Sequence, residues 1–291
     1  MVTKNINIHN EFDMSYIDTG AVQSGRELVL IHGWCSNKFH WNPQIDFFKN
    51  GFRVIAMDLR GHGASSAPDG GYSFSNFASD INYLLNDLGV KHPIIFGHSM
   101  GGAIAIHLAA VFGHNAKGLV MVDGSLNIAE HESKLESNDR IRNFKQNDSS
   151  SEIADRYGSF FSHMIDASLG KMIIKDAVKT PEHVAYASLL ALYRDDVINV
   201  GKSIKVPALY IANAYSPRSS EEVKRFVPNS NFNGSSIIQF KAWDQSSNSS
   251  NLILSNPSKI SILPVSYTHL RAHETREERG WGVGRGKKKG G

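Results

Sequence analysis

The chain has 291 residues, of which 41% are hydrophobic and 20% are charged, and its formal net charge is +3. This composition is ordinary for a globular protein and excludes a disordered or collagen-like chain. No apolar run approaches the roughly 18 residues that a membrane-spanning helix needs, and residues 1–10 lack the layout of a signal peptide. With Cys35 as the single cysteine, no disulfide can form within the chain. We therefore expect a soluble, cytoplasmic protein without a membrane partner.

The basic charge is confined to the end of the chain. Residues 265–291 hold seven Lys or Arg and three Glu, so they carry +4 and residues 1–264 carry −1. Residues 265–275 read VSYTHLRAHET, which resembles the in-frame translation of a transposon sequencing adapter. We interpret residues 265–291 as a non-native or disordered tail rather than a nucleic-acid-binding arm, and we expect no nucleic-acid partner.

The first predicted elements are a hairpin and a series of buried strands. Apolar and polar residues alternate over residues 6–8 and 12–17, around a turn at residues 10–11. Four short apolar runs bounded by Gly, Pro, Asp or Asn follow at residues 28–31, 52–57, 94–96 and 119–122. Such runs are typical of strands that are buried on both faces of a parallel sheet.

Two helices are predicted between these strands. Apolar residues repeat on one helical face over residues 77–88 and stop at Gly89, a suitable C-terminal cap. Residues 100–112 form a second, more fully apolar helix. Strands alternating with helices predict a three-layer α/β domain with a mostly parallel central sheet, of which residues 1–126 are the N-terminal part.

A helical insertion is predicted over residues 127–200, which are polar, show helical spacing and include a Pro181 suited to the first position of a helix. The core resumes over residues 201–264, with a buried strand at 206–212 and a short helix at 221–226. After about residue 232 the pattern degrades into Ser/Asn-rich sequence.

The strongest local motif is G-x-S-x-G at residues 97–101, placed between an apolar strand and the predicted helix. In this context a sharp turn projects the hydroxyl of Ser99 out of the sheet, and Gly97 and Gly101 leave room for the tight backbone. The helix start behind Ser99 supplies N–H donors where negative charge develops. We therefore predict that Ser99 is a nucleophile.

A second motif, H-G-W at residues 32–34, directly follows the apolar run that ends at residue 31. Here the backbone N–H of Trp34 could complete an oxyanion hole with the N–H of Met100. His32, Gly33 and His98 are predicted to support this arrangement.

These two motifs and D-L-R-G-H-G at residues 58–63 together resemble the α/β-hydrolase superfamily, in particular the single-chain group with a helical cap inserted after the sixth strand. The resemblance covers residues 1–244. It implies an α/β-hydrolase fold with residues 127–200 as the cap, and it implies no cofactor or metal. In residues 58–63 the polar side chains are expected to order the loop. Ser99 argues against haloalkane dehalogenases and epoxide hydrolases, which place an aspartate at this position.

A serine nucleophile needs an acid and a base. The family's usual acid position corresponds to residues 213–218, which contain no carboxylate. Some members place the acid after the preceding strand, where this chain has Asp123. We predict that Asp123 is the acid, although a structural role in a turn stays open.

The family's catalytic histidine lies in a late G-x-G-H-F loop, which residues 234–245 resemble with Ser236 at the histidine position and Lys241 at that of an acid. His269 and His273 belong to the adapter-like tail. We therefore predict that the chain lacks its general base and that the C-terminal end of the core is incomplete.

Together these features predict a serine hydrolase acting on a small carboxylic ester or related acyl substrate, impaired in this copy. A cofactor-free oxygenase or a carbon–carbon bond hydrolase of the same fold, and a non-catalytic binding protein, stay open as alternatives. The oligomeric state is not predicted.

Overall fold

The computed structural model describes residues 1–124, 138–139, 141–144, 148–160 and 167–213, and the strand segments 241–242, 250–251 and 263–265. Within these ranges, no helix is both long and apolar enough to cross a membrane.

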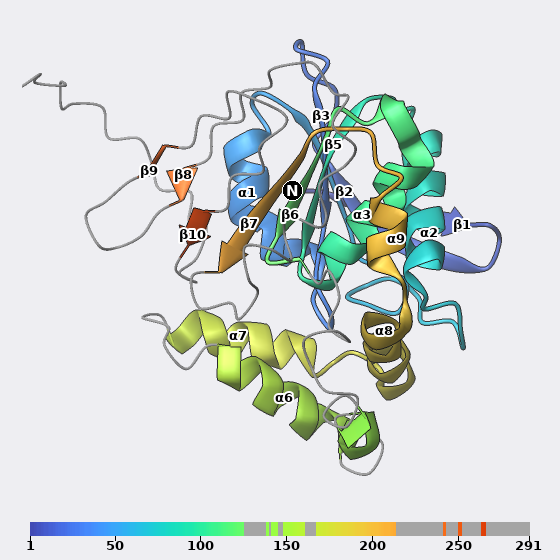
Figure 1. Ribbon diagram of the computed structural model, residues 1–291, viewed down its shortest axis with the longest axis vertical. Coiled ribbons are helices and arrows are strands. Elements are labelled where there is room, and N and C mark those ends of the chain that lie inside the picture. Colours follow the sequence, from blue (N-terminus) through green and yellow to red (C-terminus); the bar gives the residue numbers. More distant parts are fainter. Residues whose placement is uncertain are drawn as a thin grey trace, which may run out of the picture.

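A twisted sheet forms the centre of the molecule (Figure 1). Its strands, in spatial order, are β1 (Thr3–Ile8), β2 (Phe12–Asp18), β4 (Arg53–Met57), β3 (Glu27–Ile31), β5 (Pro93–His98), β6 (Gly118–Val122), β7 (Ala208–Asn213) and β10 (Leu263–Val265). β2 pairs antiparallel with β1 and β4, whereas the neighbours from β4 to β10 are parallel. The predicted hairpin and the mostly parallel central sheet are confirmed. A separate antiparallel pair joins β8 (Lys241–Ala242) to β9 (Ser250–Asn251).

Helices cover both faces of this sheet. The helices among the described residues are η1 (Lys38–Trp41), α1 (Asn42–Phe48), α2 (Phe74–Asp87), α3 (Met100–Phe112), η2 (Gly113–Asn115), α6 (Ser149–Phe160), α7 (Ala167–Ala177), α8 (Glu182–Arg194) and α9 (Val197–Gly201), of which α1, α2, α3 and α9 cover the sheet faces. α1 lies on one face, and α2, α3 and α9 lie on the other (Figure 1). The three-layer α/β architecture is therefore confirmed.

β3 shows why the central strands read as continuous apolar runs. Leu28 and Leu30 belong to the core on the α1 side, and Val29 and Ile31 belong to the core on the α3 side. Because successive side chains point to opposite faces, a strand covered on both faces needs apolar residues at every position.

The two helices predicted from periodicity are present. α2 begins after Ser73, whose hydroxyl accepts a hydrogen bond from the N–H of Asn76, and it ends shortly before Gly89, which has a positive φ of 67°. α3 spans residues 100–112 as predicted and is buried over most of its first ten residues, because it is packed between the sheet, α2 and α9.

The chain between β6 and β7 contains α6 to α9, and α6, α7 and α8 gather beyond one end of the sheet (Figure 1). α9 instead packs on α3. α8 begins at Glu182, so Pro181 is the residue before the first helical position and not the first helical residue itself.

Candidate functional site

Ser99 lies at a sharp turn between β5 and α3. Its φ of 52° and ψ of −118° are strained for a residue with a side chain, and the next residue, Met100, begins the helix. The N–H of Ser99 donates to the carbonyl of Val122 at the end of β6 over 3.0 Å, which ties the turn to the neighbouring strand. The strand–turn–helix context predicted for the G-x-S-x-G motif is therefore present.

The motif glycines are required by backbone contacts around this turn. A Cβ atom on Gly97 would lie 2.1 Å from the carbonyl oxygen of Gly101, and one on Gly101 would lie 2.3 Å from the carbonyl oxygen of Ile31. Both atoms belong to main chain that cannot move aside as a flexible side chain would. Glycine at these two positions lets β5, α3 and the end of β3 approach one another closely.

The loop that follows β3, residues 32–37, packs directly against the turn. A Cβ atom on Gly33 would lie 3.3 Å from both the Cβ of Ser99 and the Nδ1 of His98, so the loop runs alongside the serine. Trp34 follows in this loop, and Met100 stands at the positively polarised N-terminus of α3. The two predicted oxyanion donors therefore belong to the two segments that meet at Ser99.

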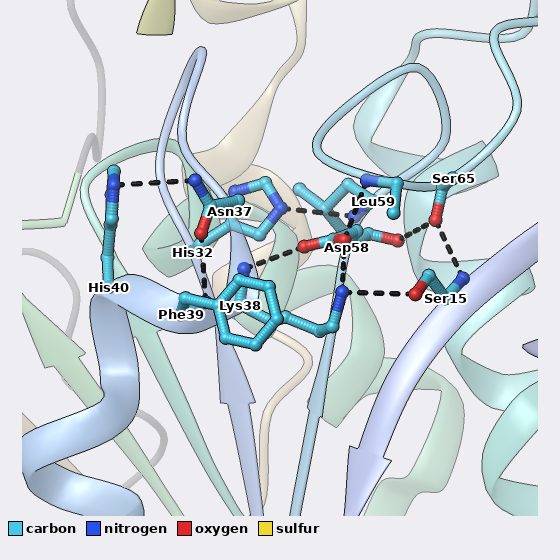
Figure 2. A network of polar contacts seen from close by, with 10 residues as sticks. Ser15, His32, Asn37, Lys38, Phe39, His40, Asp58, Leu59 and Ser65 are labelled. Carbon is cyan, nitrogen blue, oxygen red and sulfur yellow. Dashed lines mark hydrogen bonds and ion pairs between the residues drawn. The ribbon is translucent and has the colours of Figure 1, made fainter. Parts of the chain in front are cut away.

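A buried ion pair fastens the end of this loop to the core (Figure 2). The side chains of Lys38 and Asp58 are 0% and 1% exposed, and Lys38 Nζ lies 2.5 Å from Asp58 Oδ2. Asp58 also accepts from the backbone N–H groups of Lys38, over 2.7 Å, and Ala64, over 2.8 Å. Lys38 Nζ donates to the hydroxyl of Ser15 over 3.0 Å. Such a pair is tolerated away from water because nearly every polar atom in it has a partner.

His32 holds the start of the same loop (Figure 2). Its Nε2 accepts from the backbone N–H of Leu59 over 3.1 Å, so its Nδ1 carries the proton that is donated to the carbonyl of Gly33 over 2.8 Å. Burial, followed by electrostatic repulsion from neighbouring His62 when both rings would be protonated, keeps the pKa of His32 well below its usual value, in accord with a neutral ring. In a trans peptide the C=O and N–H point in opposite directions, so this bond also orients the N–H of Trp34.

The helices beyond the sheet hold Trp34 from the other side. Its indole N–H donates to the carbonyl of Ala185 in α8 over 2.9 Å, and its backbone carbonyl accepts from the hydroxyl of Tyr157 in α6. The guanidinium carbon of Arg156 lies 5.4 Å from the indole centroid. A cavity of about 270 Å³ opens beside the indole and is lined by Trp34, Asn143, Phe144, Glu152, Asp155, Arg156, Ser159 and Leu189.

Asp123 directly follows β6, on the strand whose carbonyl anchors Ser99. Its φ is 46°, and its N–H donates to the carbonyl of Ile211 in β7 over 2.7 Å. Burial lowers the pKa of His98, and the negative charge of Asp123 opposes that effect, so the carboxylate lies within electrostatic reach of the turn. The placement fits the predicted acid, whose role stays a prediction.

Several predicted features lie outside the described residues: the loop 214–218, the helix at 221–226, Ser236, His269 and His273. Lys241 lies in β8, and its side chain is not described. The predicted absence of a general base therefore stays a prediction.

Sequence reasoning missed Lys38 and Tyr157. The segment around Lys38 reads Ser-Asn-Lys-Phe-His-Trp and carries no periodic pattern that would indicate a buried lysine. Tyr157 lies 123 positions along the chain from its partner Trp34. The only available signal was Asp58, a carboxylate directly after a buried strand, which needs a donor if it is buried.

Residues 27–227 match the family described as the alpha/beta hydrolase fold. The non-heme chloroperoxidase CPO-A1 of Kitasatospora aureofaciens is 43% identical over 91 residues, which are 31% of this chain and 32% of the relative. The soluble epoxide hydrolase of Corynebacterium sp. is 37% identical over 100 residues, 34% of each chain. These matches span about a third of each relative. The esterase EaEST of Exiguobacterium antarcticum has a similar structure, with a TM-score of 0.68 and 25% identity over 77% of this chain and 85% of the esterase.

Proposed function

This chain belongs to the alpha/beta hydrolase fold family, and we propose that within it the protein is a serine hydrolase acting on a small carboxylic ester or a related acyl compound. One observation carries the proposal. Ser99 stands in a strained turn at a helix N-terminus, and the loop containing Trp34 packs against its Cβ through Gly33. This is the arrangement that an exposed nucleophile with adjacent oxyanion donors requires.

In the proposed reaction the Oγ of Ser99 attacks the ester carbonyl. The N–H groups of Trp34 and Met100 donate to the oxygen that becomes negatively charged, and the N-terminal end of α3 adds its favourable potential. The tetrahedral intermediate collapses with loss of the alcohol, which takes up the proton released by Ser99. Water then attacks the acyl-serine ester, releases the carboxylic acid and restores Ser99. No cofactor takes part.

Asp123 is proposed to orient a histidine that this copy lacks. Its position at the end of β6, within electrostatic reach of the turn, supports the assignment. Loss of one member of such a triad lowers turnover by about 10⁴- to 10⁶-fold, and what remains comes from the oxyanion hole and substrate binding. We therefore propose that the chain as written retains the nucleophile and the oxyanion hole but turns over slowly.

The relatives support an acyl substrate to different degrees. The similarity to the esterase extends over most of both chains. One shorter match is named an epoxide hydrolase, yet the serine at position 99 argues against that chemistry here because that group places aspartate at this position.

Labelling with a fluorophosphonate tests the nucleophile. We expect slow formation of a phosphonyl adduct that peptide mass spectrometry places on Ser99, and no adduct in Ser99→Ala. Equal labelling of both proteins would contradict the proposal.

The proposed loss of the histidine is tested by repair. Residues after 232 are replaced by a G-H-F loop and a closing helix of the family type, and a matched control carries alanine in place of the histidine. We expect hydrolysis of p-nitrophenyl acetate from the histidine-containing protein alone. In the chain as written, His269→Ala should leave labelling unchanged. Oxygen uptake without ester hydrolysis would instead favour the oxygenase.

A further inference from the structure

The peptide that joins Trp34 to Cys35 is held in an uncommon conformation. Cys35 has a φ of 49°, in the left-handed region that is unfavourable for a residue with a side chain. Rotating the whole peptide plane by half a turn would change ψ of Trp34 and φ of Cys35 together, and would release Cys35 from this region. The loop keeps this conformation only if another contact holds the Trp34–Cys35 peptide against that rotation.

The hydroxyl of Tyr157 is placed to oppose it. It donates to the carbonyl oxygen of Trp34, which is the atom that would swing away if the peptide turned over. Tyr157 is buried, and its ring lies nearly parallel to the Trp34 indole, with an interplanar angle of 16° and centroids 6.4 Å apart. The indole N–H is fixed independently by Ala185. The Tyr157 hydroxyl therefore binds the backbone carbonyl of a residue, Trp34, whose side chain is already held in place.

The Gly33–Trp34 and Trp34–Cys35 peptides are thus held from two different directions. His32, from the core, holds the carbonyl of Gly33 and hence the direction of the Trp34 N–H. Tyr157, from α6, holds the carbonyl of Trp34 itself. If the Trp34–Cys35 peptide turned over, ψ of Trp34 would change while His32 still held the preceding carbonyl of Gly33, and the loop beside Ser99 would have to shift.

We propose that Tyr157 is a positioning residue through which α6 keeps the oxyanion loop, residues 32–37, in the strained conformation that aligns the N–H of Trp34. The inference rests on the proposed function of Ser99 and Trp34. It couples the helices beyond the sheet to the chemistry of the turn: α6 must lie against the loop for the Trp34 donor to be aligned. In this role Tyr157 acts through the backbone carbonyl of Trp34, to which its hydroxyl donates.

The test uses the full chain and a fluorophosphonate probe, whose P=O oxygen takes the place of the ester oxyanion as Ser99 displaces fluoride. Measuring labelling against probe concentration separates the maximal rate from the half-saturating concentration. Tyr157→Phe should lower the maximal rate about tenfold, because oxyanion donors act only when aligned with the developing charge. The half-saturating concentration should stay within twofold.

Tyr72→Phe is the matched control. The Tyr72 hydroxyl also donates to a backbone carbonyl, that of Pro68, which does not belong to the oxyanion loop. We expect it to leave the labelling rate unchanged. An unchanged maximal rate in Tyr157→Phe, or an equal fall in both variants, would overturn the inference.

A second variant tests the strain argument and does not depend on one substitution. Glycine adopts a positive φ without steric cost. In a Cys35→Gly background, Tyr157→Phe should therefore slow labelling clearly less than tenfold. A full tenfold loss in that background would show that Tyr157 does not act on this peptide. If Ser99→Ala is labelled like the parent chain, the proposed function fails, and this inference fails with it. If Ser99→Ala loses labelling, the proposed function stands, and Tyr157→Phe then tests this inference alone.

Discussion

Replacing Asp58 with asparagine removes one charge of the buried ion pair while keeping nearly the same shape. The carboxylate accepts three hydrogen bonds, from the N–H of Lys38, the Nζ of Lys38 and the N–H of Ala64. An asparagine offers one carbonyl oxygen, and its NH₂ group must face one of these donors. The ammonium group of Lys38, which is fully buried, would lose its counter-charge.

The expected cost follows from this arrangement. Breaking a buried ion pair by removing one partner destabilises proteins by about 3–5 kcal/mol, because the remaining charge stays buried without compensation. For a domain of 150–250 residues, each kcal/mol shifts the melting temperature by about 2–4 °C. Asp58→Asn should therefore melt roughly 10 °C below the parent chain.

Urea unfolding of a double-mutant cycle with Lys38→Met measures the pair directly. Each single variant should be strongly destabilised, and the double variant should lose clearly less than the sum, because removing both charges leaves neither one buried alone. Asp46→Asn is the matched control, since the Asp46–Lys49 pair is exposed and should contribute under about 1 kcal/mol. The reasoning is refuted if Asp58→Asn costs as little as Asp46→Asn, or if the cycle is additive.

Two further predictions concern acid pH and the turn. Burial lowers the pKa of His62 and of His40 from 6.5 to about 4. Between these pH values the unfolded chain binds protons that the folded chain does not. The free energy of unfolding should therefore be full above pH 6.5 and fall as the pH drops toward 4. His62 alone should cost about 2 kcal/mol between pH 7.5 and 5.0, and equal urea midpoints at the two pH values would contradict this. Gly101→Ala should destabilise the fold by about 1–3 kcal/mol through collision with the Ile31 carbonyl and should abolish labelling of the serine, whereas Gly158→Ala, in open space on α6, should be neutral or stabilising in a thermal melt.

The parts of the fold that the sequence predicts well are those set by local pattern. The helix over residues 100–112 and the buried strand at 28–31 were predicted because burial on all sides, or on both faces of a strand, requires apolar residues at nearly every position. The turn at Ser99 was predicted because its glycines lie within two residues of the serine. In each case the residues that determine the structure are neighbours in the chain.

The contacts that fix the oxyanion loop could not be predicted in this way. Lys38 and Asp58 are 20 residues apart, and Tyr157 and Trp34 are 123 residues apart. Lys38 is buried because the strand that ends just before Asp58 lies beside it. Tyr157 binds the Trp34 carbonyl because α6 packs against the loop after β3. Propensity and periodicity carry neither kind of information.

Two of the contacts that restrain the loop containing Trp34 therefore differ in strength. On the core side, the ion pair of Lys38 and Asp58 is integral to the packed domain, and its loss should lower global stability. On the other side, the hydroxyl of Tyr157 donates to one buried carbonyl, and its loss should slow the chemistry and cost about 1–3 kcal/mol of stability, less than the loss of the ion pair. Asp58→Asn should therefore lower the melting temperature more than the labelling rate, and Tyr157→Phe should lower the labelling rate more than the melting temperature. A common line through Asp58→Asn and Tyr157→Phe would mean that both residues act through stability alone, and that α6 has no specific hold on the oxyanion loop.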